Sequence, residues 1–401
     1  MIEALKVLFG QAGADAMTAA SALELAPLEL LSAQAAGAKP LAATAVLREQ
    51  ARRTGRQAPL DRAESLAERE IAGARGRRLR AARLDLARTL MLRAELFGLS
   101  AVRERLEAAI TACGGNRLTP VEAAALAGLV GRKAALDAYA EETAEGLLAA
   151  GALLDAACEK LRPLRATEPD AAEALLARSG LAFIAGVKLG QPELLDQAGE
   201  DLRLIVEEND EDLRPLTRAR ALALCGAGLS FLSEWAGDDA GVERGLALME
   251  AAAEVFTEDH SPLDAVAVNL SLGLALERAG ADGLAHLSRA ALGAGGDGAH
   301  VELRARAAWL DARLSRAARD PARAQRLKRE LVTGLGAPRS QAQRLRWAID
   351  QIALARLSGE RRPGADMALL EAEDILKEAD LFDLARRAGA ELKAPQGSAA
   401  P

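Results

Sequence analysis

The residue types that carry out most enzyme chemistry are few in this chain and lie far apart. His260, His286 and His300 are its three histidines, separated by 26 and 14 residues. A metal ion held on a helix needs ligands about one helical turn apart, and none of these histidines has a histidine or cysteine at that distance. We therefore expect surface or loop histidines rather than ligands or general bases, and we expect no metal and no cofactor.

The cysteines are equally isolated. Cys113, Cys158 and Cys225 are an odd number of thiols at wide spacing, which suggests neither a disulfide framework nor a clustered metal site and fits a reducing cytoplasm. Their apolar helical neighbours predict buried small side chains rather than reactive thiols. GAGGDG at 293–298 lacks the flanking strand that a dinucleotide loop needs. With no matched acid, base or nucleophile, we expect that the chain is not an enzyme.

One stretch of the chain is strongly basic. Residues 48–88 hold 12 arginines against six acidic residues, and ARGRRLRAAR at 74–83 concentrates them. Such a stretch could bind an acidic protein, RNA or an anionic membrane. Aromatic residues that stack on bases are absent nearby, so we expect a solvated helix face and disfavour RNA or membrane contact. If the stretch does bind a partner, the candidate residues are Arg75, Arg77, Arg78, Arg80 and Arg83.

The chain as a whole is acidic. Its formal net charge is −7 and its pI is near 5.4, which gives it no electrostatic reason to bind nucleic acid, and we expect no DNA partner. An acidic loop, EENDEDLRP at 207–215, offers a complementary patch for self-association, so a homo-oligomer is left open.

The first nine residues, MIEALKVLF, lack the basic region of a signal peptide, and no run approaches the roughly 20 apolar residues of a spanning helix. Ile2, Leu5, Leu8 and Phe9 fall near one face of a short helix. We expect this helix to cap the first hairpin rather than to dock on a membrane.

Composition predicts an all-α fold. Half of the 401 residues are hydrophobic, but alanine and leucine dominate, and aromatic residues make up 2% of the chain. The β-branched and aromatic residues that strands prefer are therefore scarce.

Short breaks recur along the chain at a near-constant interval. Apolar helical segments end at Gly98, Gly190, Gly237 and Gly280 and are each followed by a second amphipathic segment, the pattern of an αα-hairpin. The first interval is about twice the next, so we expect a degenerate copy between 98 and 190. The pattern predicts about seven hairpins over residues 76–380, with an irregular helical cap or small module at 1–75 and a helix remnant and disordered tail at 381–401.

Glycines also lie inside the apolar segments. Gly180, Gly228 and Gly273 are 48 and 45 residues apart, within helices where glycine costs roughly 1 kcal/mol relative to alanine. We interpret them as points where an inner helix lies close against its neighbour.

One copy of the repeat resembles a known family. In NLSLGLALERAGADGLAHLSRAAL, the order Leu272-Gly273, Leu276, Gly280, Ala285 is similar to the tetratricopeptide repeat (TPR) pattern. The spacing of 40–48 residues exceeds the family's usual 34, and HEAT-type helix pairs are the alternative.

The resemblance implies a right-handed α-solenoid whose inner helices form a concave surface that binds peptides or partner proteins. We therefore expect an interaction scaffold or adaptor for a protein or peptide partner. The alternative is a ligand- or peptide-responsive regulator, with the repeats as sensor and the N-terminal region as effector.

Overall fold

The computed structural model describes Glu24 and residues 26–393, except 115–117, 165–168, 210–213, 294–295, 335, 337, 339 and 359–363. Within these ranges the regular structure consists of eighteen α-helices and one short 3-10 helix, and no strand is present. The all-α prediction is confirmed. The predicted capping helix at the N-terminus and the predicted tail from 394 lie outside the described residues.

In chain order, the helices are α3 (Leu28–Gly37), α4 (Pro40–Thr54), α5 (Gln57–Gly73), α6 (Gly76–Phe97), α7 (Arg103–Cys113), α8 (Pro120–Glu141), α9 (Ala144–Leu161), η1 (Arg162–Leu164), α10 (Pro169–Leu189), α11 (Pro192–Glu208), α12 (Pro215–Ala236), α13 (Asp239–Val255), α14 (Pro262–Arg278), α15 (Leu284–Leu292), α16 (His300–Ala317), α17 (Pro321–Gly334), α18 (Gln341–Ser358), α19 (Ala365–Glu378) and α20 (Phe382–Lys393).

Local sequence explains where the helices begin and end. Proline opens α8 and α12, where its missing N–H would have no partner anyway, and Thr119 adds a capping box with Glu122. Gly237 ends α12 in the left-handed conformation, with φ of 71°. The breaks recognised in the sequence are therefore true helix ends.

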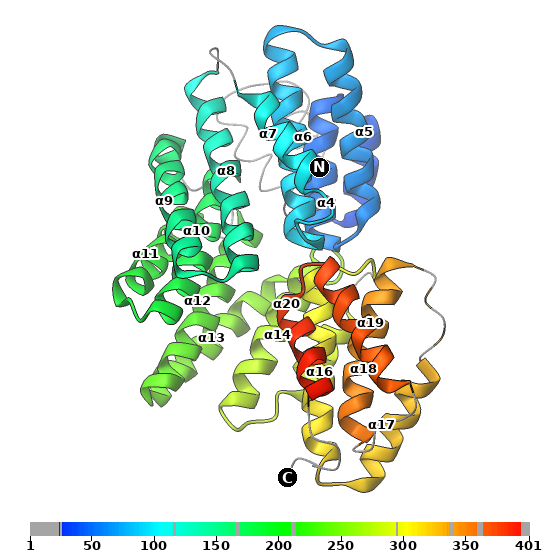
Figure 1. The fold of residues 1–401 in the computed structure, drawn as a ribbon. Helices are drawn as coiled ribbons and strands as arrows, with labels where there is room; N and C mark the ends of the chain where they lie inside the picture. The colour runs from blue at the N-terminus through cyan, green and yellow to red at the C-terminus, as the bar shows by residue number, and fades with distance from the viewer. Residues whose placement is uncertain are drawn as a thin grey trace.

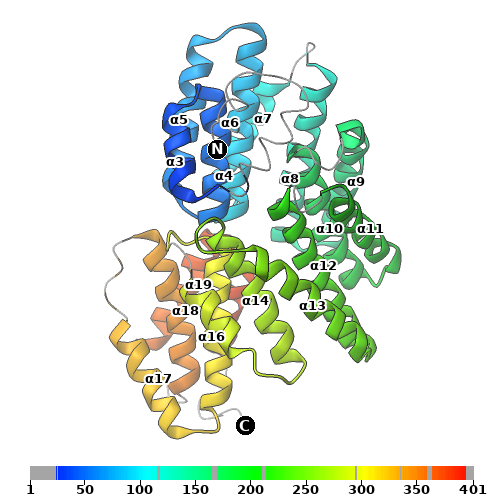
Figure 2. The same cartoon turned by 180° about the vertical axis from the view of Figure 1, so that it is seen from behind.

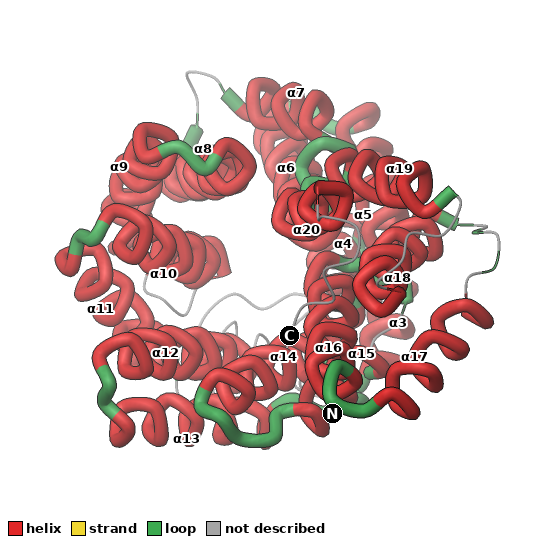
Figure 3. Tube along the Cα trace, turned by 60° about the horizontal axis from the view of Figure 1, so that its bottom comes forward, coloured by secondary structure: helices red, strands yellow, loops and turns green. Residues whose placement is uncertain are grey.

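Helices that follow one another in the chain pack together, and clusters of buried leucine and alanine lie between successive helices. Figure 3 shows α6, α8, α10, α12, α14 and α16 around the centre of the molecule, with α9, α11 and α13 outside them. An inner helix thus has neighbours on two sides, which accounts for its two apolar faces.

The array closes on itself, which the repeats did not predict. In addition to the sequential contacts, α4 packs on α14 and α6 packs on α16. We call α3–α7 the N-terminal block, α8–α13 the arc and α14–α20 the C-terminal block. Figures 1 and 2 show the N-terminal block lying on the C-terminal block, with the arc joining them at one side, so the chain forms a ring.

Of the three interior glycines, Gly228 and Gly273 mark close contacts as expected, whereas a Cβ atom at Gly180 would lie at an ordinary 3.6 Å from the Tyr139 hydroxyl. A Cβ atom at Gly228 would lie 3.3 Å from the ring of Phe183 in the neighbouring inner helix. A Cβ atom at Gly226 would lie 2.5 Å from the backbone oxygen of Gly245 in α13, an atom that cannot move without moving its helix. The sequence pattern did not single out Gly226, yet this position requires glycine more strictly than Gly228 does.

We expect Gly226→Ala to destabilise the protein by about 2 kcal/mol or more, because the new methyl group forces α12 and α13 apart. Gly228→Ala is the matched control: its gain in helix propensity, about 1 kcal/mol, offsets the small shift required of the Phe183 ring. Urea unfolding monitored by circular dichroism measures both variants. Equal stabilities for the two would contradict the assignment.

In the part of the chain that the structure describes, no helix combines the length and apolar character needed to cross a bilayer.

Candidate functional site

The basic patch predicted from the sequence lies at the tip formed by α5 and α6. Arg75, Arg77 and Arg78 are exposed, whereas Arg80 and Arg83 are half-buried. Three of its arginines make contacts within the protein: Arg78 pairs with Glu70 at 2.6 Å, Arg80 pairs with Glu122 at 3.3 Å, and Arg83 donates to the Ala112 carbonyl at 3.0 Å. A binding role for this patch stays a prediction.

Two cavities lie at the centre of the ring, and none of the five patch arginines lines either of them. The first, of about 410 Å³, lies among α4, α6, α8, α10 and α12, and we call it the charged cavity. The second, of about 550 Å³, lies where the arc, the C-terminal block and the end of α6 meet, and we call it the seam cavity. Glu95 lines both, so the two cavities are neighbours.

Buried ion pairs build the charged cavity. The side chain of Arg132, 5% exposed, forms a bidentate pair with Glu95 at 2.7–2.9 Å and also pairs with Glu173. Arg52 contacts the other carboxylate oxygen of Glu173. Burial raises the pKa of the Glu173 carboxyl, but Arg132 and Arg52 outweigh burial and hold that pKa well below its usual value. The carboxylate is therefore charged at neutral pH and ties α4, α8 and α10 together.

Two further ion pairs repeat with the period of the array. Arg220 on α12 forms a bidentate pair with Asp264 on α14 at 2.7–2.8 Å, and Arg306 on α16 pairs in the same way with Asp350 on α18 at 2.6–2.8 Å. Each pair spans 44 residues. The triplet Arg-Ala-Arg occurs twice, ending once at Arg220 and once at Arg306. This repeat is visible in the sequence, but the spacing of the glycines did not reveal it.

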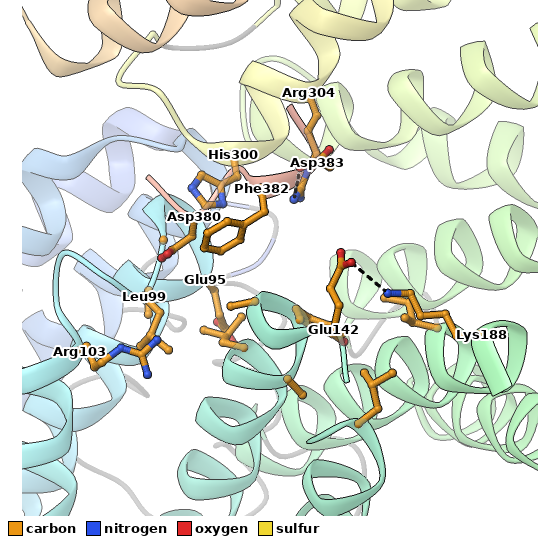
Figure 4. Close-up of a pocket in the computed structure, with 18 residues that line it drawn as sticks. Glu95, Leu99, Arg103, Glu142, Lys188, His300, Arg304, Asp380, Phe382 and Asp383 are labelled. Carbon is orange, nitrogen blue, oxygen red and sulfur yellow. Dashed lines mark ion pairs between the residues drawn. The ribbon is translucent and has the colours of Figure 1, made fainter. Parts of the chain in front are cut away.

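Side chains from both sides of the ring line the seam cavity, as Figure 4 shows. The arc contributes Glu142 from the end of α8 and Lys188 from α10. The C-terminal block contributes Arg304 from α16 and Asp383 from α20. The remaining labelled residues are Glu95, Leu99, Arg103, His300, Asp380 and Phe382. The walls therefore carry both signs of charge around an apolar interior.

The histidines differ in part from expectation. His286 lies within α15, where its Nδ1 atom is 2.9 Å from Oδ1 of Asn269. His300 is the first residue of α16 and is largely buried beside the seam cavity, rather than on the surface or in a loop. Burial and, to a smaller extent, Arg304 lower its pKa to about 4, so its imidazole is neutral at pH 7. Among the described residues, its Nε2 atom has no hydrogen-bond partner.

Aromatic side chains gather on α10 and α12, two inner helices of the arc. The ring centroids of Phe183 and Phe231 are 5.9 Å apart, and those of Phe231 and Trp235 are 6.2 Å apart. The guanidinium of Arg278 lies 5.7 Å from the Phe231 centroid. Trp235 is 71% exposed, and Ile184, adjacent to Phe183, is exposed and lines the cavity. We call Phe183, Phe231 and Trp235 the aromatic patch.

Two of the three cysteines, Cys113 and Cys158, are buried. Burial raises the pKa of the Cys113 and Cys158 thiols to about 11, so both are protonated and poorly nucleophilic at neutral pH. In the described parts of the chain, no three histidine, cysteine, aspartate or glutamate residues are grouped to hold a metal ion. The arrangement is suited to binding through apolar contact and charge.

A scan against models of known protein families finds no match, and a search of curated proteins also finds none.

Proposed function

We propose that the protein is an interaction scaffold or adaptor, built as a right-handed, TPR-like α-solenoid, that binds a peptide segment of a partner protein along its inner face. The observation that carries this proposal is the aromatic patch on α10 and α12, in which Trp235 is 71% exposed. Trp and Arg side chains dominate the energetics of many protein interfaces, and an exposed tryptophan packed among aromatic neighbours is held ready for a partner.

The ring limits the kind of partner segment. Cavities of about 550 and 410 Å³ have the volume of sites that hold a small molecule or a few residues of peptide. A folded domain would require a wide concave surface, and the contact between the N-terminal and C-terminal blocks narrows that surface. An extended segment, with apolar side chains on the aromatic patch and its polar groups among the charges of the seam cavity, fits the arrangement.

Selection of peptides from a random phage-displayed library tests the proposal. We expect selected peptides to bind the protein and to lose roughly thirtyfold in affinity with Trp235→Ala, the effect of removing a hot spot of about 2 kcal/mol. Leu292→Ala is the control, because Leu292 is also exposed, at 73%, but ends α15 and is not part of the aromatic patch. Peptides that bind both variants equally, or a library that yields no binder, would count against the proposal.

One contact favours a second candidate, the ligand-responsive regulator. Asp380, in the turn before α20, accepts a hydrogen bond of 2.7 Å from the backbone N–H of Ser100 in the turn after α6. Asp380 also lines the seam cavity. A ligand in this cavity would therefore touch a residue that joins the two blocks, so its binding could change how the N-terminal block is held.

A further inference from the structure

Two described residues other than glycine take positive φ at turns of the array, Glu142 and Asp380. Five helices are followed by a glycine with positive φ, at Gly55, Gly98, Gly190, Gly237 and Gly280, with φ between 64° and 102°. The turn between α8 and α9 has the degenerate sequence expected there and places Glu142 at this position, with φ of 54°. A side chain in this conformation costs about 1 kcal/mol, which glycine would avoid.

The side chain of Glu142 reaches across the seam. Its two carboxylate oxygens accept hydrogen bonds of 3.0 Å from the two terminal nitrogens of Arg386 on α20. The residues are 244 positions apart, and the pair connects the arc to the C-terminal block. Lys188 lies 3.6 Å from the same carboxylate. Glu142 itself lines the seam cavity, so the pair stands at its edge.

The rest of this seam is weakly held. The helices of the arc pack extensively on α6 and on α14, but in the described residues none packs extensively on α16–α20. The Arg386 and Glu142 side chains are 59% and 37% exposed, and an exposed pair of this kind contributes little energy and weakens with salt. The pair can therefore break without unfolding the blocks on either side.

We propose that Glu142 and Arg386 form a latch across the seam cavity, and that the arc moves away from α16–α20 when the latch opens, while its packing on α6 and α14 is kept. Strained residues persist where the surrounding structure or the function requires them, and here the strain places the carboxylate opposite Arg386. Opening widens the route to the cavity for a peptide. The entry of a peptide through the opened seam rests on the proposed function, whereas the motion itself does not.

Distances between spin labels test the latch without a ligand. Labels at Glu200→Cys on α11 and Met367→Cys on α19, both exposed, report the separation of the arc from the C-terminal block in a chain whose native cysteines are replaced by alanine. We expect Arg386→Gln to add a longer distance component, with the open population rising up to about fivefold. High salt should produce the same change in the parent chain and little further change in the variant.

The neighbouring arginine supplies a matched control. Arg387 pairs with Asp311 inside the C-terminal block, so Arg387→Gln removes the same charge from α20 without touching the seam. We expect its distances to equal those of the parent chain. Unchanged distances in Arg386→Gln, or an equal change in Arg387→Gln, would overturn the latch.

Glu142→Gly separates a latch from a merely structural ion pair. Glycine relieves the strain at this turn, so we expect an unchanged or higher thermal midpoint together with the longer distance component. A lower midpoint with unchanged distances would assign the pair to stability alone and overturn the proposal. Peptide binding is tested separately, by comparing the association rates of selected peptides with Arg386→Gln and with the parent chain. If the distances change as expected but no peptide binds faster to the variant, the proposed peptide-binding function is wrong and the latch is retained.

Discussion

Replacing Arg53 with methionine is expected to destabilise the protein by about 3–5 kcal/mol, the range seen when one partner of a buried charge network is removed. The Arg53 side chain is 0% exposed. Its Nη1 atom donates to the backbone oxygens of Glu24, Ala26 and His260 at 2.9–3.0 Å, and its Nε atom lies 3.3 Å from the Glu49 carboxylate. Methionine fills much of the volume but donates no hydrogen bond, so buried acceptors lose their donor.

The contact with His260 gives this arginine its structural importance, because His260 precedes α14 and lies 207 residues away in the chain. Arg53 therefore fastens the N-terminal block to the turn that leads into α14, the first helix of the C-terminal block. Urea unfolding monitored by circular dichroism measures the loss. Arg56→Met is the control, since Arg56 is exposed just beyond the end of α4 and should change stability by less than about 0.5 kcal/mol. A loss below about 1 kcal/mol for Arg53→Met would show that the blocks are joined mainly by other contacts.

Local features of the fold could be predicted from the sequence because they depend on nearby residues. Alanine and leucine composition predicted the helices, and the turn glycines predicted where several of them end. Gly237 shows why: a helix that stops needs a residue able to take positive φ, and glycine does so without strain. The same pattern located the degenerate turn between 98 and 190, although it did not identify Glu142 as the residue there.

Ring closure could not be predicted in this way. The contacts that produce it join residues 207 and 244 positions apart, far beyond the repeat interval, and they involve individual side chains rather than a periodic pattern. When an arginine contacts a backbone carbonyl far away in the chain, the residues around neither partner predict that contact. The interpretation therefore anticipated a curved binding face but not its enclosure.

The basic stretch shows that long-range contacts also limit what the sequence predicts about surface charge. Counted along the chain, residues 48–88 form a run of excess positive charge. In space, Arg52 pairs with Glu173 and Arg88 pairs with Asp170, carboxylates from 121 and 82 residues further on. Much of this charge is neutralised inside the protein, so a count along the sequence overstates the basic surface. The arginines that stay exposed are Arg75, Arg77 and Arg78 at the tip of α5 and α6, together with Arg56, Arg62 and Arg69.

Replacing Glu173 with glutamine should produce the second large loss, about 3–5 kcal/mol at pH 7. The substitution keeps the shape of the side chain and removes the charge that Arg132 and Arg52 share in the charged cavity. Arg132 retains Glu95, but Arg52 loses its carboxylate partner on α10. Because three inner helices meet at this residue, the loss should appear in global unfolding by urea rather than in local fraying.

The pH dependence supplies a second test of the same residue. The folded pKa of Glu173 lies below its ordinary value near 4.5, so its contribution is fully present above that value and is lost as the pH falls toward the folded pKa. The stability difference between the parent chain and Glu173→Gln should therefore shrink in acid. Glu145→Gln, at an exposed position in the first turn of α9, should show no comparable difference at either pH. A difference that stays constant between pH 7 and pH 3 would mean that Glu173 acts through packing or hydrogen bonding rather than through its charge.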